Sequence, residues 1–239
     1  MLADYVTEMR KRDETIYMNG RHEYKYYINQ SDYAQLRSRL RAVAKPDKHA
    51  DENGGYKIRS LYFDNYLDKM VTEKLAGLNR REKFRVRFYN DISDFMHLEK
   101  KSKSNNLTYK EKAALTKESC FEILSGRYEC LKEADIPLLM ELYAKMHYQS
   151  LRPKVIVDYY REVYIYPAGN VRITLDSNIR MSNNVAAFLE PKLATTPAAN
   201  ALILEVKYDG FIPDVMRSIL QMNQRNRTEF SKYVVSRLV

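Results

Sequence analysis

Residues 83–89 read KFRVRFY, and charged and apolar side chains alternate along the whole stretch. Phe84, Val86 and Phe88 occupy one phase of a two-residue repeat. The other phase holds three cations, which are Lys83, Arg85 and Arg87. Because successive side chains of a β-strand point to opposite faces, this pattern predicts a strand with one apolar face and one cationic face. We therefore expect a sheet that carries a row of positive charge.

The composition agrees with a folded, basic protein. The chain has 239 residues, of which 45% are hydrophobic, and its formal net charge is +9. This charge favours a polyanionic partner such as nucleic acid, phosphorylated metabolites or an anionic membrane. No apolar run approaches the roughly 18–20 residues of a membrane helix, and no signal-peptide pattern is present, so we expect a cytoplasmic protein. Cys120 and Cys130 match no metal or disulfide spacing and are expected to be reduced.

The remaining sequence predicts an α+β fold in one domain, with about eight strands in a mostly antiparallel sheet that is either open or closed. Strands are expected at residues 23–28, 56–65, 83–90, 94–103, 153–166, 171–179 and 201–210. Residues 31–44 are expected to form a helix with Ser31 as its N-cap, and a short helix around residues 68–77 should close at Gly77. Residues 110–150 are expected to be helical, with one helix starting at Pro137, and further helices should start at Pro213 and near Phe230.

Charged residues recur in phase on other expected strands. Three strands carry Glu-x-Lys, at Glu23–Lys25, Glu99–Lys101 and Glu205–Lys207, and a fourth carries Arg172, Thr174 and Asp176. For one strand alone, a solvated face is the simpler interpretation. The repetition favours a shared anion site, because like charges about 7 Å apart repel by roughly 2.4 kcal/mol at an effective dielectric constant near 20.

No glycine-rich phosphate loop is present, so side chains would have to hold any bound phosphate. Arginine forks suit pairs of phosphate oxygens, and lysine supplies point charge. Carboxylates among so many cations suit a divalent metal that also contacts phosphate oxygens.

The motifs RHEYKY, IRSLYFDN, KFRVRFY, LEKKSK, VIVDYYRE, VRITLD, LEVKYDG and SKYVVSR stand in this order along the chain. In this order they resemble the VTC-type polyphosphate polymerase domain, a member of the triphosphate tunnel metalloenzymes. The resemblance covers residues 18–239 and leaves residues 1–17 as a polar N-terminal segment. It does not extend to the regulatory domain and membrane helices of eukaryotic members, so polyphosphate translocation and inositol-phosphate sensing are not expected to carry over.

The resemblance implies a closed antiparallel eight-stranded β-tunnel with flanking helices. It also implies that the γ-phosphate of ATP is transferred to a growing chain of inorganic polyphosphate with Mn²⁺ or Mg²⁺ as cofactor. ATP or another nucleoside triphosphate and polyphosphate would be the ligands, and no nucleic acid is expected. Arg161 shares its phase with Val155, Val157 and Tyr159, so a bulge or a local switch of face is expected there.

By the same resemblance, seven cations would act in catalysis, which are Lys25, Arg85, Arg87, Arg161, Arg172, Lys207 and Lys232. Four residues would bind substrate, which are Lys74, Lys101, Lys110 and Ser231. Three carboxylates would hold the metal, with Glu205 as the first candidate and Glu23 and Glu99 behind it.

Two alternatives stay open at this point. A triphosphate hydrolase of the same tunnel fold would use water in place of the acceptor phosphate. A non-catalytic polyphosphate or nucleic-acid binding module would need the cations but no metal. Carboxylates within the basic strands argue against a nucleic-acid binder, since they would repel the ligand unless a metal intervened.

Overall fold

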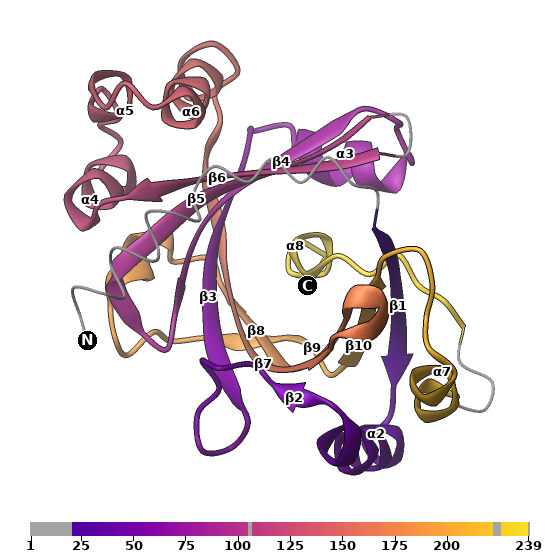
Figure 1. The fold of residues 1–239 in the computed structure, drawn as a ribbon. Helices are drawn as coiled ribbons and strands as arrows, with labels where there is room; N and C mark the ends of the chain where they lie inside the picture. The colour runs from indigo at the N-terminus through magenta and orange to yellow at the C-terminus, as the bar shows by residue number, and fades with distance from the viewer. Residues whose placement is uncertain (1–20, 105–106, 222–225, 239) are drawn as a thin grey trace. The chain divides into compact units, whose positions relative to one another are not determined.

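The computed structural model describes residues 21–104, 107–221 and 226–238, and the polar segment expected at residues 1–17 lies outside them. The described residues form an α+β structure with a mostly antiparallel sheet of ten strands and with seven α-helices (Figure 1). The strand order is β1-β10-β8-β7-β3-β4-β5-β6, and in addition β2 pairs with β7 and β9 pairs with β8.

The chain divides into two compact units, and each unit is assembled from separate segments of the sequence. Of the described residues, the first unit takes Arg59–Ile156 and Ser182–Ala194. The second unit takes residues 21–58, Val157–Met181 and residues 195–238. Strands β3 (Gly55–Asp64) and β7 (Arg152–Tyr166) contribute residues to both units, and β8 (Val171–Ser182) contributes its last residue to the first unit.

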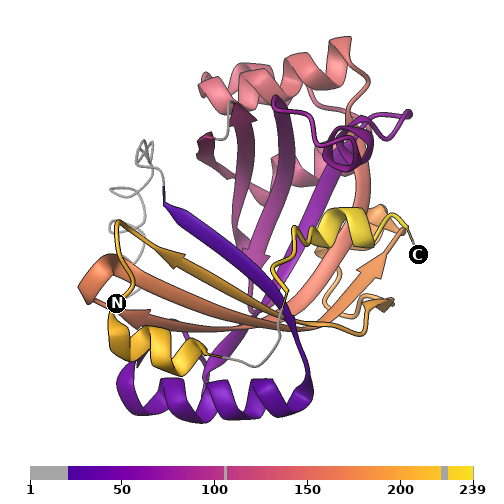
Figure 2. The same cartoon turned by 90° about the vertical axis from the view of Figure 1, so that its right-hand side faces the viewer.

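In the first unit, β3 is followed in the sheet by three antiparallel strands, which are β4 (Arg81–Tyr89), β5 (Ile92–Ser104) and β6 (Leu107–Leu115). The other elements of this unit are α3 (Lys69–Leu75), α4 (Lys117–Leu124), α5 (Cys130–Glu133), α6 (Pro137–Tyr148) and the 3₁₀ helix η2 (Val185–Leu189). Helices α4, α5 and α6 lie together on one side of β4–β6 (Figures 1 and 2). The apolar phase of KFRVRFY is buried, as predicted, at Phe84, Val86 and Phe88.

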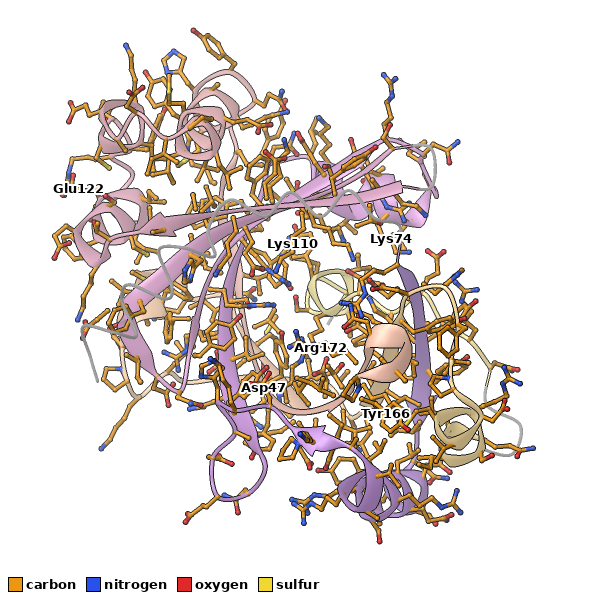
Figure 3. All side chains as sticks on the ribbon, in the orientation of Figure 1. Asp47, Lys74, Lys110, Glu122, Tyr166 and Arg172 are labelled. Atoms are coloured by element: carbon orange, nitrogen blue, oxygen red, sulfur yellow. The ribbon has the colours of Figure 1, made fainter. Side chains whose placement is uncertain are left out.

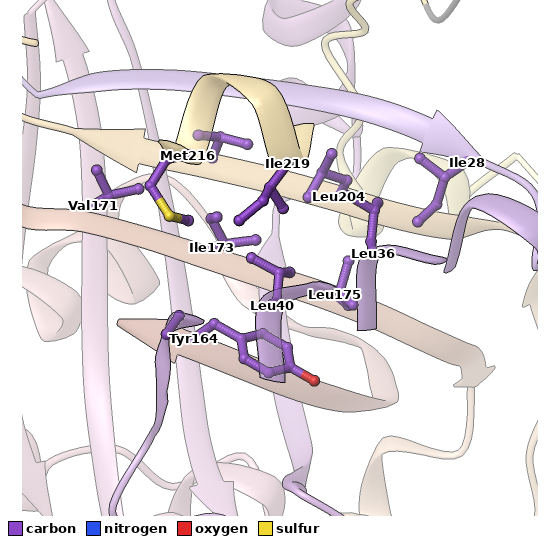
Figure 4. Packing of buried hydrophobic residues seen from close by; sticks show 12 residues of the cluster. Ile28, Leu36, Leu40, Tyr164, Val171, Ile173, Leu175, Leu204, Met216 and Ile219 are labelled. Atoms are coloured by element: carbon purple, nitrogen blue, oxygen red, sulfur yellow. The ribbon is translucent and has the colours of Figure 1, made fainter. Parts of the chain in front are cut away.

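In the second unit, β1, β10, β8 and β7 are neighbours. Its elements are β1 (His22–Ile28), α2 (Gln30–Val43), β2 (Lys45–Pro46), the 3₁₀ helix η1 (Ala168–Asn170), β8 (Val171–Ser182), β9 (Thr196–Ala199), β10 (Leu202–Tyr208), α7 (Asp214–Leu220) and α8 (Lys232–Val235). Helices α2 and α7 pack side by side (Figure 2). Between them and the strands lies an apolar core that includes Leu36, Leu40, Ile173, Leu204 and Met216 (Figure 4).

Most of the expected elements are confirmed within a few residues, including the β4–β5 pair and the helix that starts at Pro137. The expectation that residues 110–115 are helical is wrong, because they belong to β6. Lys110 and Lys112 alternate with Glu111 and Ala113, and this two-residue repeat lets β6 pair with β5.

The predicted N-cap of α2 is also wrong. Asn29, not Ser31, caps the helix: its Oδ1 accepts a hydrogen bond from the Asp32 amide at 2.8 Å, and an Asp32 carboxylate oxygen accepts one from the Asn29 amide at 3.0 Å. This reciprocal pair is a capping box built from Asn and Asp. Gly77 ends the α3 region with a φ of +67°, as the sequence predicts.

The order of the strands bears on the predicted tunnel. Among the described residues, the order starts at β1 and ends at β6, and no pairing joins these two strands. The antiparallel α+β class is therefore confirmed, whereas closure into an eight-stranded tunnel is not. In the same part of the chain, no helix has both the length and the apolar character that crossing a membrane requires. Cys120 and Cys130 are free thiols, as expected.

Candidate functional site

One face of β4–β6 in the first unit collects the cations predicted from KFRVRFY. Side chains that lie directly opposite each other on paired antiparallel strands share a face. Lys83 pairs with Lys101, which in turn pairs with Lys110, and Arg81 pairs with Lys103. We call this surface the basic face; its charged members are Arg81, Lys83, Arg85, Arg87, Glu99, Lys101, Lys103, Lys110 and Lys112. It therefore carries eight cations and one carboxylate.

The basic face lies on the side of the strands away from α4 and α6. Phe84, Val86 and Leu98 point to the other side of the same strands and are fully buried, since α4 and α6 pack against β5. Figure 3 shows Lys110 on the side of the strands away from α5 and α6. The apolar phase thus fixes the orientation of the strands, and the cations are directed to the opposite face as a consequence.

Glu99 is the centre of the basic face and is 2% exposed. Its Oε2 accepts a hydrogen bond from Arg85 Nε at 2.7 Å, and its Oε1 accepts one from Lys110 Nζ at 2.9 Å. Arg87 Nη1 lies 3.6 Å from Oε2. Burial by itself would raise the pKa of Glu99, but Arg85, Arg87 and Lys110 hold it well below its usual value. Glu99 is therefore a carboxylate at neutral pH.

Two lysines of the basic face have unusually low pKa values. For Lys83, burial lowers the pKa, and the cations Lys74, Arg81 and Lys101 lower it further, to about 8. For Lys110, burial and the neighbouring Arg85 and Arg87 outweigh the attraction of Glu99, and the pKa is again about 8. Burial, with the neighbouring cations adding to it, therefore disfavours protonation of these two lysines.

In the second unit, the charged face of β1, β10 and β8 has a different pattern. Glu23 pairs with Lys207, which pairs with Arg172; Lys25 pairs with Glu205, which pairs with Thr174. Charges of opposite sign thus alternate along β1 and β10 and lie opposite each other between these two strands, whereas Lys207 lies opposite another cation, Arg172, on β8. We call this surface the alternating face; it consists of Glu23, Lys25, Arg161, Arg172, Thr174, Asp176, Glu205, Lys207 and Lys232.

Short contacts join the carboxylates and lysines of the alternating face. Lys25 Nζ lies 2.9 Å from a Glu23 oxygen and 4.0 Å from Glu205 Oε1. Lys207 Nζ lies 3.0 Å from Glu205 Oε1 and 3.7 Å from Glu23 Oε2. Burial would raise the pKa of Glu205, but Lys207, Lys25 and Arg161 hold it well below its usual value. Glu205 is thus ionised and already surrounded by three cations.

Asp176 holds two further cations in place. Arg161 donates two hydrogen bonds to it, from Nε at 2.6 Å and from Nη2 at 2.7 Å, and Lys232 of α8 also donates to it. Despite burial, Arg161 and Lys232 lower the pKa of Asp176 to about 2. The ring of Tyr159 lies 5.3 Å from the Arg161 guanidinium and 4.5 Å from the Lys232 ammonium. Tyr159 and Arg161 therefore lie close together on this face, and the bulge or local switch of face expected along residues 155–161 stays a prediction.

The oxygen donors suit a divalent metal only in part. Among the described residues, no group of three or more His, Cys, Asp or Glu side chains is placed to bind one metal ion. Glu23 and Glu205 do lie together on the alternating face, and Glu99 belongs to the basic face of the other unit. Mg²⁺ commonly takes one or two carboxylates and completes its shell with water and substrate phosphates. Glu205 and Glu23 fit that pattern.

A family model described as "VTC domain" matches residues 20–239. The chain belongs to the VTC domain family. Among proteins with curated descriptions, none matches this sequence.

One solved structure shares the fold of this VTC domain, and a second is reported with it. A Hippeastrum protein whose title reports a dominant triphosphatase activity is 14% identical, with a TM-score of 0.53, over 90% of this chain and 94% of that one. A Pyrococcus horikoshii protein is 13% identical, with a TM-score of 0.47, over 91% of this chain and 98% of that one. The resemblance drawn from the sequence motifs is confirmed at the level of the family.

The predicted site residues of the VTC domain fall into two groups. Arg85, Arg87, Lys101, Lys110 and Glu99 lie on the basic face of the first unit. Those on the alternating face of the second unit are Lys25, Arg161, Arg172, Lys207, Lys232, Glu23 and Glu205.

The remaining predicted residues lie beside these faces. Lys74, in α3, is close enough to Lys83 to lower its pKa. Ser231 caps α8, where its Oγ accepts a hydrogen bond from the Val234 amide at 3.5 Å. Arg172 lies 3.9 Å from Asp47, and Figure 3 labels both residues. The functional roles of all these residues remain predictions.

Several residues of the two faces were not in the predicted set. Asp176 has the same strand phase as Arg172 and Thr174 in VRITLD, and this phase was the available signal for it. Lys112 was missed because its segment was expected to be helical. Arg81 and Lys103 extend the phases of Lys83 and Lys101 by one repeat, so the alternation itself could have identified them.

Proposed function

We propose that this VTC domain is a metal-dependent polyphosphate polymerase that transfers the γ-phosphate of ATP to a growing polyphosphate chain. The observation that carries the proposal is the basic face, where eight cations accompany one carboxylate on three neighbouring strands. Such an excess of cations suits a ligand with many negative charges along its length. Phosphates of a single nucleotide would leave many of these cations uncompensated.

In this proposal the alternating face binds the metal ion and positions phosphate groups. Glu205 and Glu23 would hold Mn²⁺ or Mg²⁺, which when bound neutralises charge on phosphate oxygens. Arg161 and Lys232 are held by Asp176 in fixed orientations, so they can contact phosphate oxygens without first being ordered. Phosphoryl transfer depends mainly on such positioning and charge stabilisation, with little covalent chemistry by the protein.

The same proposal includes closure of the sheet into an eight-stranded tunnel. It also places the reaction in the cytoplasm, where ATP is supplied. The proposed ligands are ATP or another nucleoside triphosphate and inorganic polyphosphate. Nucleic acid is not expected, because the carboxylates Glu23, Glu205 and Asp176 alternate with the cations of the second unit.

A triphosphate hydrolase is the second candidate. It is supported by the fold shared with the Hippeastrum protein, whose title reports a dominant triphosphatase activity. A hydrolase needs a position for water in place of the acceptor phosphate, and both reactions can use the same cations. A non-catalytic polyphosphate-binding module is the third candidate, and it would need no metal.

The deciding experiment incubates purified protein with ATP and Mn²⁺. Products are resolved by gel electrophoresis with a polyphosphate stain, and free phosphate is assayed in parallel. We expect ADP and a ladder of polyphosphate chains. Stoichiometric orthophosphate without a ladder would establish the hydrolase, and polyphosphate binding with neither product would establish the binding module.

A further inference from the structure

Helix α6 buries one of its sides in the first unit. Leu138, Leu142 and Met146 are buried on the side that packs against β5 and β6 (Figure 1). A surface helix usually turns polar and charged residues to solvent on its other side. Helix α2 follows this rule, and its exposed residues include Gln30, Gln35, Ser38, Arg39 and Arg41.

The other side of α6 does not follow this rule. Ile136, Met140, Tyr143 and His147 recur at the spacing i, i+4, i+7 and i+11, so they form one row along the helix. We call this row the outer stripe. Tyr143 is half-buried, and the other three residues are exposed. The outer stripe thus presents apolar and aromatic side chains to solvent over the length of the helix.

The two charged residues within Pro137–Tyr148 are directed to the strands. Glu141 accepts a hydrogen bond from Lys100 of β5 at 2.7 Å, and Lys145 forms an ion pair with Glu82 of β4. Both positions lie about 100–140° around the helix from Met140. They therefore add no charge to the outer stripe.

Aromatic rings give the outer stripe a firm contact surface. The rings of Tyr143 and His147 stack with their centres 5.7 Å apart, and the ring of Tyr128 lies 5.8 Å from that of Tyr143. Tyr148 meets His147 edge to face at 4.7 Å. The centres of protein interfaces are rich in Tyr and Met and poor in Lys and Glu. The outer stripe has this composition, which favours contact with another protein surface.

The two ends of α6 carry opposite charges. Before its N-terminus, Glu133 and Asp135 are exposed and outnumber the neighbouring Lys132. Beyond its C-terminus, Arg152 is exposed, with its guanidinium 5.1 Å from the ring of Tyr128. Arg152 also donates hydrogen bonds to the carbonyls of the last turn and of the loop that follows, which hold it at this end.

Such a distribution of charge is self-complementary. A two-fold interface brings the same surface of two copies together, so that each residue meets its counterpart's neighbour and the reverse. If two α6 helices lie antiparallel, Glu133 and Asp135 of one copy come near Arg152 of the other. A parallel arrangement would instead bring like charges together at both ends.

We infer that the outer stripe of α6 is the interface of a homodimer in which the α6 helices of two copies pack antiparallel. The inference goes beyond the proposed function and does not depend on it. The helix has 12 residues and is therefore about 18 Å long. Because this is small for a specific interface, we expect a dissociation constant on the order of 10 μM.

The test is sedimentation velocity of the full chain over concentrations from about 1 μM to about 500 μM, which bracket the expected dissociation constant. Wild type is compared with Met140→Glu, which places a charge near the middle of the outer stripe. The matched control is Val215→Glu, because Val215 of α7 is 41% exposed and Met140 is 42% exposed. Thermal melting checks that each variant is folded. A mixture of Met140→Glu with Met140→Lys is measured as well.

We expect a wild-type dimer, a dissociation constant raised about tenfold or more in Met140→Glu, and no change in Val215→Glu. The mixture should associate more tightly than either of its components, because Met140 lies near the two-fold axis and opposite charges then meet there. A wild-type protein that stays monomeric would overturn the inference and would indicate that a different partner covers the outer stripe. Equal association of Met140→Glu and wild type, equal weakening in the control, or a mixture that associates no better than its components would also overturn it.

Discussion

At the scale of single residues, Glu205 has the clearest role to test. Substitution Glu205→Gln keeps the shape of the side chain and removes the charge that attracts a hard cation. We expect Mn²⁺-dependent turnover of ATP to fall by about 10–100-fold, the loss typical of groups in and around a metal site. The circular dichroism spectrum should be unchanged, because the backbone pairing of β10 does not involve the side chain.

The control for this variant is Glu122→Gln, which makes the same chemical change at an exposed ion pair with Arg127 on the surface (Figure 3). Its turnover should match that of the wild type. Equal turnover of Glu205→Gln and wild type across a Mn²⁺ titration would show that Glu205 is not the essential ligand.

Lys83 gives a pH-dependent prediction. In the unfolded chain the pKa of Lys83 is near 10.5, the ordinary value for lysine, and in the folded protein it is about 8. Between these values the unfolded state binds more protons, so the contribution of Lys83 to stability rises with pH. We expect Lys83→Met to melt at a higher temperature than wild type near pH 7, with the difference shrinking toward about pH 10. A difference that grows with pH in thermal melts would contradict the lowered pKa of Lys83.

At the scale of elements, α2 allows the predicted and observed caps to be compared. Asn29→Ala removes the acceptor for the Asp32 amide and should lower the free energy of unfolding by about 1 kcal/mol. Ser31→Ala is the matched control, since Ser31 lies inside the helix and should change stability by much less. Urea denaturation of both variants provides the measurement. A larger loss from Ser31→Ala would restore the cap expected from the sequence.

For these elements, the face to which each strand residue points can be predicted from the sequence, but the pairing register between strands cannot. Strand phase was readable from KFRVRFY, because the apolar residues Phe84, Val86 and Phe88 leave only one face for the cations. Cross-strand register was not readable: the pairing of Lys83 with Lys101 depends on how β5 aligns with β4, which no local pattern encodes. The bidentate contact of Arg161 with Asp176 joins residues of different strands and was missed for the same reason.

Local sequence patterns also gave wrong predictions where a segment suits both a helix and a strand, or where two residues both suit a helix cap. Residues 110–115 contain good helix formers, Lys, Glu and Ala, and this composition outweighed the two-residue alternation that places them in β6. The cap of α2 was displaced by two residues because Asn29 and Ser31 are both good N-caps. Tertiary pairing decides such cases.

At the scale of the whole molecule, the two faces predict separate responses to metal removal. The basic face is dominated by cations and the alternating face is nearly balanced. In EDTA we therefore expect polyphosphate binding to persist while ATP turnover stops. Binding should weaken steeply between about 0.1 M and about 1 M salt, as the Debye length falls from about 10 Å to about 3 Å. Calorimetric titration with polyphosphate, beside an ADP-release assay, measures both. Loss of binding in EDTA would show that the cations alone do not hold the chain.

The division of the chain into interleaved segments limits how its parts can be studied separately. The boundaries between units fall at residues 58/59, 156/157, 181/182 and 194/195, so neither unit is a contiguous stretch of sequence. Any truncation that removes one unit also cuts β3 or β7, which contribute to both. Fragments that carry only one face are therefore not expected to fold as the intact protein does. The function of each face is better tested by charge-changing point substitutions in the whole chain.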